Sequence, residues 1–341
     1  MAGVSSGSRS TPTPPPTPTP DRPVSTVAFS CRLPVLTLDL SGGYAYHGAF
    51  VSFPSRVYQE DPKGIVEGIG DGDLGTQAKP MLFGPGYPGP FYDLAMKRWL
   101  PIGPDQTSPD GTAYAVAYQP LGGAGGDSVH IVSVATGKDR LLKVGTPPTA
   151  TGWQVLDFDG RYVYLLTIPE TVKLPVGVWR LDSSTGNLVR LINIGSVLSL
   201  RAPNVWVGRN NPADPSPPKS SRGPLFDSIV EVNMTTGAQT TWIYRPGQAV
   251  SILGLDNSGH PVVNVSRGPG FNEASGSVLL LSRPGDPGTK ISGGSVALTR
   301  MQADVGRIWF GTDQGIYLWT QANGLRPVFA YQSMWPAGRC V

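Results

Sequence analysis

The chain has 341 residues, of which 44 are glycine and 35 are proline, and only 15% carry a charge. Its formal net charge is +3 and its basic residues form no run, which excludes the basic stripe typical of a nucleic-acid-binding protein. The sequence contains no window of eighteen uninterrupted apolar residues, so it offers no candidate membrane-spanning helix. Abundant turn-forming residues, with eight tryptophans available for a core, indicate a folded, turn-rich chain with little room for long helices.

Residues 1–23 are rich in serine, threonine and proline. Proline fixes φ and removes a hydrogen-bond donor, so we expect an extended, unpacked stalk in front of a single domain at 24–341. Stalks of this composition commonly tether secreted bacterial domains. The segment lacks the apolar region of a signal peptide, so an N-terminal anchor outside this chain would be its only link to a membrane. A dispensable tail is the alternative.

An insertion from Pro54 to about Tyr87 breaks the regular spacing of the strand patterns that follow. It places Asp71 and Asp73 among glycines, and such carboxylates suit Ca²⁺, which prefers hard oxygen ligands. The spacing does not match a full EF-hand loop and the distant acidic ligand is absent, so a solvated acidic loop is the alternative. No cofactor is expected.

A short phrase recurs six times, at intervals of 38 to 51 residues. In each copy an apolar run ends in a polar residue, and a turn residue follows four positions later. A polar side chain that bonds the nearby backbone, followed by a residue with positive φ, is typical of a hairpin between two strands. Strands with this period predict an all-β fold, a β-propeller of four-stranded blades in which the phrase joins the third and fourth strands. The copies begin at Asp93, Ser133, Asp182, Asn233, Ser282 and Thr320.

A second marker, a turn ending in glycine before a β-branched or aromatic run, has nearly the same period and marks the second strands. One copy, in the stretch that begins Thr107-Ser-Pro-Asp-Gly, resembles the Ser-Pro-Asp-Gly repeat of TolB-type propellers. Another copy, continuing into Trp309-Phe-Gly-Thr, resembles a repeat of propellers in two-component sensor proteins. Both resemblances imply the propeller fold over about residues 31–335, and neither implies a particular function.

The two markers divide the chain into six predicted blades, with residues 331–341 returning to the N-terminal strand. Seven blades is the alternative, because the first segment is long enough to contain another. The predicted blades are 31–102, 107–145, 150–193, 195–245, 249–292 and 295–330.

Propeller ligands commonly bind at the central channel, which the first strands line. Candidate first strands are 153–157, 197–201, 250–256 and 296–300. We predict ligand contacts at Trp153, Arg201 and Arg300, because an indole stacks on sugar faces and a guanidinium pairs with carboxylate or phosphate. The alternative is that Trp153 packs between blades and the arginines are solvated rim charges. No nucleophile elbow, zinc-protease motif or phosphate loop is present, so no catalytic residue is predicted.

The two cysteines, Cys31 and Cys340, flank the series of repeats. The first and last strands of a propeller meet where the ring closes, so we expect these cysteines to form a disulfide. Two reduced, buried cysteines is the alternative. A disulfide here would close nearly the whole chain into one loop and is typical of an oxidising compartment.

These features predict an extracytoplasmic, monomeric, non-catalytic propeller, extracellular or attached to the cell envelope. Its partner is expected to be a protein or a glycan at the cell surface. The alternative is a polysaccharide-active hydrolase or lyase with its site in the central channel. Its two carboxylates would come from different blades, which sequence spacing does not reveal.

Overall fold

The structure is a computed structural model, and it is nearly all β. Within the described residues the one helical element is a short 3₁₀ turn, η1 (Pro104–Gln106). No helix among them is long and apolar enough to cross a membrane. The described residues are 24–39, 45–66, 91–100, 102–117, 128–145, 150–169, 176–194, 196–211, 225–267, 276–294 and 296–341.

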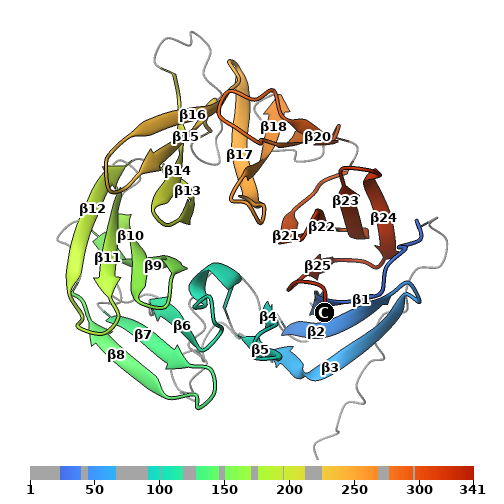
Figure 1. Ribbon diagram of the computed structural model, residues 1–341, viewed down its shortest axis with the longest axis horizontal. Coiled ribbons are helices and arrows are strands. Elements are labelled where there is room, and N and C mark those ends of the chain that lie inside the picture. The colour runs from blue at the N-terminus through green and yellow to red at the C-terminus, as the bar shows by residue number, and fades with distance from the viewer. Residues whose placement is uncertain are drawn as a thin grey trace, which may run out of the picture.

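The strands form blades around a central channel (Figure 1). Four blades have four consecutive antiparallel strands, with the first strand beside the channel and the fourth at the outer surface. One comprises β9 (Ala150–Phe158), β10 (Tyr162–Pro169), β11 (Val176–Asp182) and β12 (Leu188–Ile194), and the next β13 (Ser196–Arg201), β14 (Asn204–Arg209), β15 (Ser228–Asn233) and β16 (Gln239–Tyr244). The other two comprise β17 (Gln248–Leu255), β18 (Pro261–Arg267), β19 (Ser277–Leu280) and β20 (Thr289–Ser292), then β21 (Arg300–Asp304), β22 (Arg307–Thr312), β23 (Gly315–Thr320) and β24 (Gly324–Ala330).

Two further blades depart from this plan. In one, Thr107 makes an isolated bridge to Tyr114 in place of a first strand. Its remaining strands are β6 (Ala113–Ala117), β7 (Ser128–Ser133) and β8 (Asp139–Lys143). The other blade joins the two ends of the domain, with β25 (Met334–Pro336) beside β1 (Cys31–Asp39), followed by β2 (Ala45–Phe53) and β3 (Val57–Val66).

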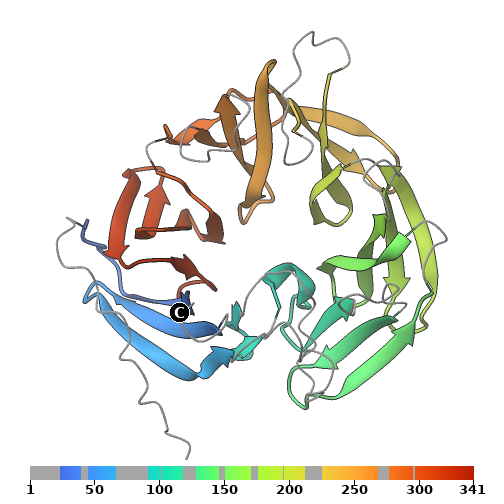
Figure 2. The same cartoon turned by 180° about the vertical axis from the view of Figure 1, so that it is seen from behind.

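The predicted six-bladed propeller is therefore confirmed for the described residues. A two-stranded hairpin, β4 (Phe91–Asp93) and β5 (Arg98–Leu100), lies in the ring between β1–β3 and β6–β8 (Figure 2). It carries the first copy of the repeated phrase, so this copy marks a hairpin outside the six blades. The predicted segment 31–102 thus contains most of one blade and, where the alternative of seven blades requires another blade, a two-stranded hairpin.

The ring closes as the sequence predicted. Strand β25 pairs antiparallel with β1, with Thr37 opposite Met334 and Val35 opposite Pro336. Cys31 and Cys340 form a disulfide across this seam; their Cα atoms are 5.5 Å apart and the residues are separated by 309 positions in sequence. The expected disulfide is confirmed, and the C-terminal strand supplies the innermost position of the blade that the N-terminal strands complete.

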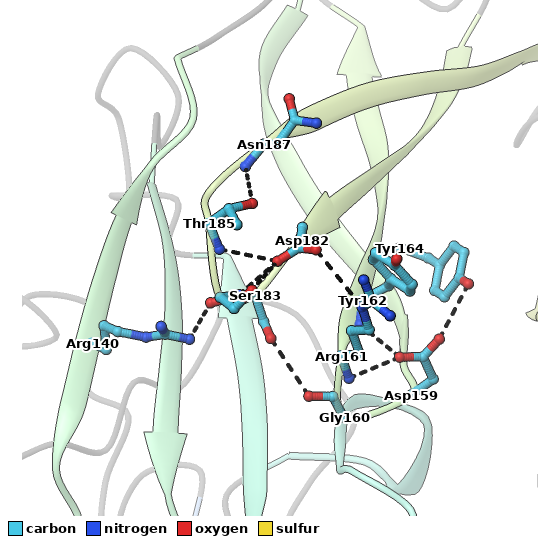
Figure 3. A network of polar contacts seen from close by, with 11 residues as sticks. Arg140, Asp159, Gly160, Arg161, Tyr162, Tyr164, Asp182, Ser183, Thr185 and Asn187 are labelled. Carbon is cyan, nitrogen blue, oxygen red and sulfur yellow. Dashed lines mark hydrogen bonds and ion pairs between the residues drawn. The ribbon is translucent and has the colours of Figure 1, made fainter.

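The other five copies of the repeated phrase confirm its interpretation, because each joins the last two strands of a blade. In one of them the Asp182 carboxylate accepts hydrogen bonds from the backbone N–H groups of Ser184 and Thr185, at 2.9 and 3.0 Å (Figure 3). Gly186 supplies the positive φ of 77° that ends the turn. Arg140 of the preceding blade donates a hydrogen bond to the Ser183 carbonyl oxygen, so the turn also links two blades.

Hydrophobic cores fill the spaces between neighbouring blades. Ala115 and Val129 of one blade pack with Val163 and Leu165 of the next, and all four side chains are fully buried. Burial of one such valine or leucine contributes roughly 1.5–3 kcal/mol, so the apolar faces hold adjacent blades together.

One predicted strand boundary is wrong. The first strand of the last four-stranded blade was expected at 296–300, whereas β21 begins at Arg300 and continues to Asp304. Its end is set by a tight turn, because Asp304 pairs with Arg307 and Gly306 between them has φ of 67°. Arg300 therefore stands at the start of its strand and not at its end.

Candidate functional site

A cavity of about 760 Å³ lies at the centre of the ring. Its lining comes from the first strands β9, β13, β17 and β21, from the η1 segment and from residues around β25. The volume is within the roughly 300–1,000 Å³ of typical small-ligand sites. The central channel is thus the place in the described part of the chain where many blades contribute to one concave surface.

The cavity lining combines charges of both signs with apolar side chains. Leu253, Leu255, Met301 and Phe91 supply apolar surface. The charged residues of the lining are Asp105, Asp157, Asp159, Asp256, Arg201, Arg300 and Arg339.

Two of these aspartates hold the turns between first and second strands. Asp159 accepts hydrogen bonds from the backbone N–H groups of Arg161 and Tyr162, at 2.9 and 2.6 Å (Figure 3). Asp256 accepts one from the backbone N–H of Ser258 at 2.8 Å. These hydrogen bonds occupy acceptor positions of both carboxylates and give them a structural role.

Asp157 lies at the end of β9 and is half-buried. Its carboxylate accepts a hydrogen bond from the Phe158 backbone N–H at 3.0 Å and one from the Ala202 N–H of the next blade at 3.3 Å. Burial is the main reason that the pKa of this carboxyl is raised to about 6; the two hydrogen bonds lower the pKa, and the neighbouring charge of Asp105 raises it. Asp157 can therefore take up a proton near neutral pH.

Asp105 reaches the cavity from η1, which starts with Pro104 and is fixed at both ends. The Gln106 side chain accepts a hydrogen bond from the Gly103 N–H at 3.3 Å and donates one to the Val155 carbonyl on β9 at 3.4 Å. The Asp105 residue is exposed, and it lines the cavity. The surrounding protein displaces part of its hydration and so raises its pKa, which the positive charge of Arg201 partly opposes.

The arginines come from different parts of the ring. Arg201, at the end of β13, donates hydrogen bonds to the backbone carbonyls of Asp256 and Asn257 in the next blade, both at 3.4 Å. The Arg300 guanidinium lies over the Trp335 ring, 4.6 Å from its centroid. Arg339 follows β25 and is exposed, and no described residue forms a hydrogen bond or ion pair with its side chain.

The structure thus brings two of the three predicted ligand contacts, Arg201 and Arg300, into one cavity. Trp153 does not line this cavity. It is 2% exposed, packs edge-on against Trp179 and donates a hydrogen bond to the Gly145 carbonyl at 2.7 Å.

The predicted calcium ligands Asp71 and Asp73 lie outside the described residues. Within the described ranges, no group of three or more histidine, cysteine, aspartate or glutamate side chains is placed to hold a metal ion.

Sequence reasoning did not select Asp105, Asp157 or Arg339. A signal existed for Asp157, because the predicted first strands ended in the charged residues Asp157, Arg201 and Asp256, and all three line the cavity. Asp105 and Arg339 stand in segments that do not repeat, so no periodicity could have marked them.

Comparisons with known proteins leave the family open. The chain matches no family model and no curated protein. Solved structures that it resembles include a prolyl endopeptidase, with 13% identity and a TM-score of 0.46, covering 87% of this chain and 39% of that chain. The chain therefore spans about two fifths of that endopeptidase's length.

Two other resembling structures are TolB from Acinetobacter baumannii and an oligogalacturonate lyase from Vibrio parahaemolyticus. The TolB match has 12% identity and a TM-score of 0.40, and covers 87% of this chain and 68% of that chain. The lyase match has 8% identity and a TM-score of 0.48, and covers 87% of this chain and 79% of that chain. All three TM-scores are below 0.5, so the class of this protein, a β-propeller with a mixed-charge central cavity, rests on its own sheet topology and cavity lining.

Proposed function

We propose that this chain is a non-catalytic binding propeller whose ligand occupies the central cavity. The observation that carries the proposal is the convergence of Arg201 and Arg300, from different blades, on a cavity of ligand size. A guanidinium is a planar donor that matches carboxylate and phosphate groups, and its hydrogen bonds strengthen where the protein excludes bulk water. The ligand should therefore carry at least one anionic group.

The disulfide supports an extracytoplasmic location for this binding function. Disulfides persist in oxidising compartments and are rare in the cytosol of mesophiles, where thiols are kept reduced. The Cys31–Cys340 bond joins the two ends of the ring. An oxidising compartment would preserve this bond and so help to keep the ring closed around the cavity. We propose a monomer acting at the cell envelope or outside the cell.

The proposal is tested with a panel of acidic oligosaccharides, neutral oligosaccharides and short peptides. Binding is detected as a rise in unfolding temperature, which follows from ligand association with the folded state, and is quantified by calorimetry. Arg300→Gln should weaken binding about tenfold or more, because it removes a charge-assisted hydrogen bond worth roughly 1.5–3 kcal/mol. Arg201→Gln should change the affinity as well, because it removes a positive charge from the cavity lining.

Arg283→Gln is the matched control, because Arg283 is exposed on an outer turn and does not line the cavity. Circular dichroism establishes that each variant is folded before binding is compared. The proposal fails if no member of the panel binds, or if a bound ligand is held equally by the wild type and both cavity variants.

A second candidate function, cleavage of a polysaccharide by hydrolysis or by elimination, is favoured by one specific observation. Asp105 and Asp157 interact electrostatically in the same cavity, and both have raised pKa values, chiefly because of desolvation. A carboxyl held protonated near neutral pH can protonate a glycosidic oxygen while an ionised partner activates water. Release of reducing ends from acidic polysaccharides, abolished by Asp157→Asn, would support this function, and an inactive wild type would exclude it for the substrates tested.

A further inference from the structure

Two aspartates and two arginines of the lining lie on opposite sides of the central cavity. Strand β9 and the η1 turn lie on one side of the channel, and β21 and the C-terminal end of the chain lie on the other (Figures 1 and 2). The first side carries Asp105 and Asp157, and the second carries Arg300 and Arg339. We call these the acidic wall and the basic wall.

Each wall contains one charged group whose hydrogen-bonding capacity the described residues leave unused. Among the described residues, none donates a hydrogen bond to the Asp105 carboxylate, and none forms a hydrogen bond or ion pair with Arg339. An ionised carboxylate accepts at two oxygens and a guanidinium offers five N–H donors, so both retain capacity for a ligand. Asp159 and Asp256 contrast with them, because turn N–H groups already occupy their carboxylates.

Arg201 sets the net charge of the acidic wall. It lies close enough to Asp105 to act on that carboxyl, while its guanidinium is held by two carbonyls of the next blade. With one positive charge beside two carboxylates, the acidic wall has room for one cationic group of a ligand.

We propose that the ligand is a short peptide with free termini, bound with its amino group at the acidic wall and its carboxylate at the basic wall. This rests on the function proposed above and specifies the ligand class of the same cavity. A single amino acid carries both charges on one carbon, whereas a short peptide separates its charges by several residues and so suits groups on opposite sides of the channel. An acidic glycan has no cationic group and would place its charges near two carboxylates.

The apolar part of the lining is consistent with a peptide. Leu253 and Leu255 on β17 and Met301 on β21 contribute aliphatic and thioether surface to the lining. Such surface suits peptide side chains, whereas sugar rings are usually held by exposed aromatic faces. The described lining includes only two aromatic residues, Phe91 and Phe158, and Phe158 is 2% exposed.

The test uses a random tetrapeptide mixture in four forms: free, N-acetylated, C-amidated and blocked at both ends. A mixture is suitable because the recognised features are the termini and not the side chains. The free form should bind best, and each block should weaken binding about tenfold or more, as expected for loss of a charge-assisted hydrogen bond. The doubly blocked form should show the weakest binding.

Two variants assign the termini to the walls. Arg339→Gln should weaken binding of the free and acetylated forms, which keep a carboxylate, and leave the amidated form unchanged. Asp105→Asn should weaken binding of the free and amidated forms, which keep an amine, and leave the acetylated form unchanged. Arg283→Gln and Asp313→Asn are matched controls, because both residues are exposed and do not line the cavity.

The outcomes separate the ligand class from the binding function. Equal binding of free and doubly blocked peptides, or an unaltered preference in both wall variants, overturns the peptide assignment. If oligosaccharides bind in a manner that Arg300→Gln abolishes while peptides do not bind, the peptide assignment fails and the binding function stands. If neither class binds, both fail.

Discussion

The outer hairpin at Asp182 and the cavity turn at Asp105 place the same side chain in opposite surroundings. Asp182 accepts hydrogen bonds from Ser184 and Thr185, and these bonds lower its pKa to about 2. Asp105 receives no hydrogen bond from the described residues, and loss of hydration raises its pKa. The propeller frame uses its carboxylates to build turns, whereas the cavity keeps one carboxylate available.

This difference gives a criterion for separating structural charges from ligand-binding charges in a repeat fold. A carboxylate whose acceptors are filled by its own turn stabilises the blade, as the side chain of Asn233 does in the next hairpin by accepting from Thr235 at 3.0 Å. A charged group that faces a cavity without such donors contributes little to the frame. Three experiments test this separation of frame and cavity.

The largest expected effect concerns the seam of the frame. Replacing both Cys31 and Cys340 with serine should lower the free energy of unfolding by about 3–5 kcal/mol, because the disulfide closes a very long loop and so restricts the unfolded chain. Urea unfolding of the wild type with and without a thiol reductant measures this. Reductant should leave the double variant unchanged, and a wild type insensitive to reductant under unfolding conditions would contradict the prediction.

A smaller effect is expected from the cavity carboxyl Asp157. Its folded-state pKa of about 6 is above the unfolded value of 3.8, so between these values the folded state binds more protons than the unfolded state. The free energy of unfolding should therefore fall as the pH rises from 4 to 6, by about 1–3 kcal/mol, and remain lowered above pH 6.

Asp157→Asn should flatten this pH dependence, since asparagine does not titrate. The measurement is the difference in urea unfolding free energy between variant and wild type at several pH values from 4 to 7.5. Parallel pH profiles for the two proteins would show that Asp157 does not carry the effect.

The smallest effect is expected when Asp182 and Asp105 are each replaced and the stabilities of the two variants are compared. Asp182→Ala should lower the urea midpoint at neutral pH, because it removes the acceptor of the turn, and the deficit should shrink as the pH falls from 3.8 towards 2 and the wild-type carboxyl is protonated. Asp105→Ala should leave the midpoint unchanged or raise it. Asp182→Asn should have nearly the urea midpoint of the wild type, since Asn233 accepts the same kind of hydrogen bond in the next blade.

If Asp105→Ala destabilised the protein as much as Asp182→Ala, the separation of frame from cavity would be wrong. Thermal unfolding of both variants beside the wild type gives an independent measure of the same ranking.

The parts of the fold that the sequence predicted are those governed by local rules or by closure. The hairpins at Asp182 and Asn233 were predictable because a polar side chain, its turn and the following glycine are adjacent in sequence. The disulfide was predictable because a ring brings its two ends together. The boundary at Arg300 was wrong because the tight turn at Gly306 lets β21 continue to Asp304, which pairs directly with Arg307.

The cavity was only partly predictable. Arg201 and Arg300 were selected because they belong to expected first strands, and both line the cavity. Asp105 and Arg339 could not be found in this way, since their position depends on how η1 enters the channel and how the chain returns after β25. The repeated sequence patterns indicate the strands and turns within each blade. The cavity that the blades share also depends on segments that differ from blade to blade.

The innermost position of the closing blade is occupied by β25, and this determines the order in which the protein matures. During synthesis, β25 and Arg339 emerge from the ribosome after every other described strand. Until then the N-terminal blade lacks its channel-side strand and the basic wall is incomplete. A nascent chain can therefore form most of its blades before the ring closes, and the central cavity gains the lining from residues around β25 only when β25 pairs with β1.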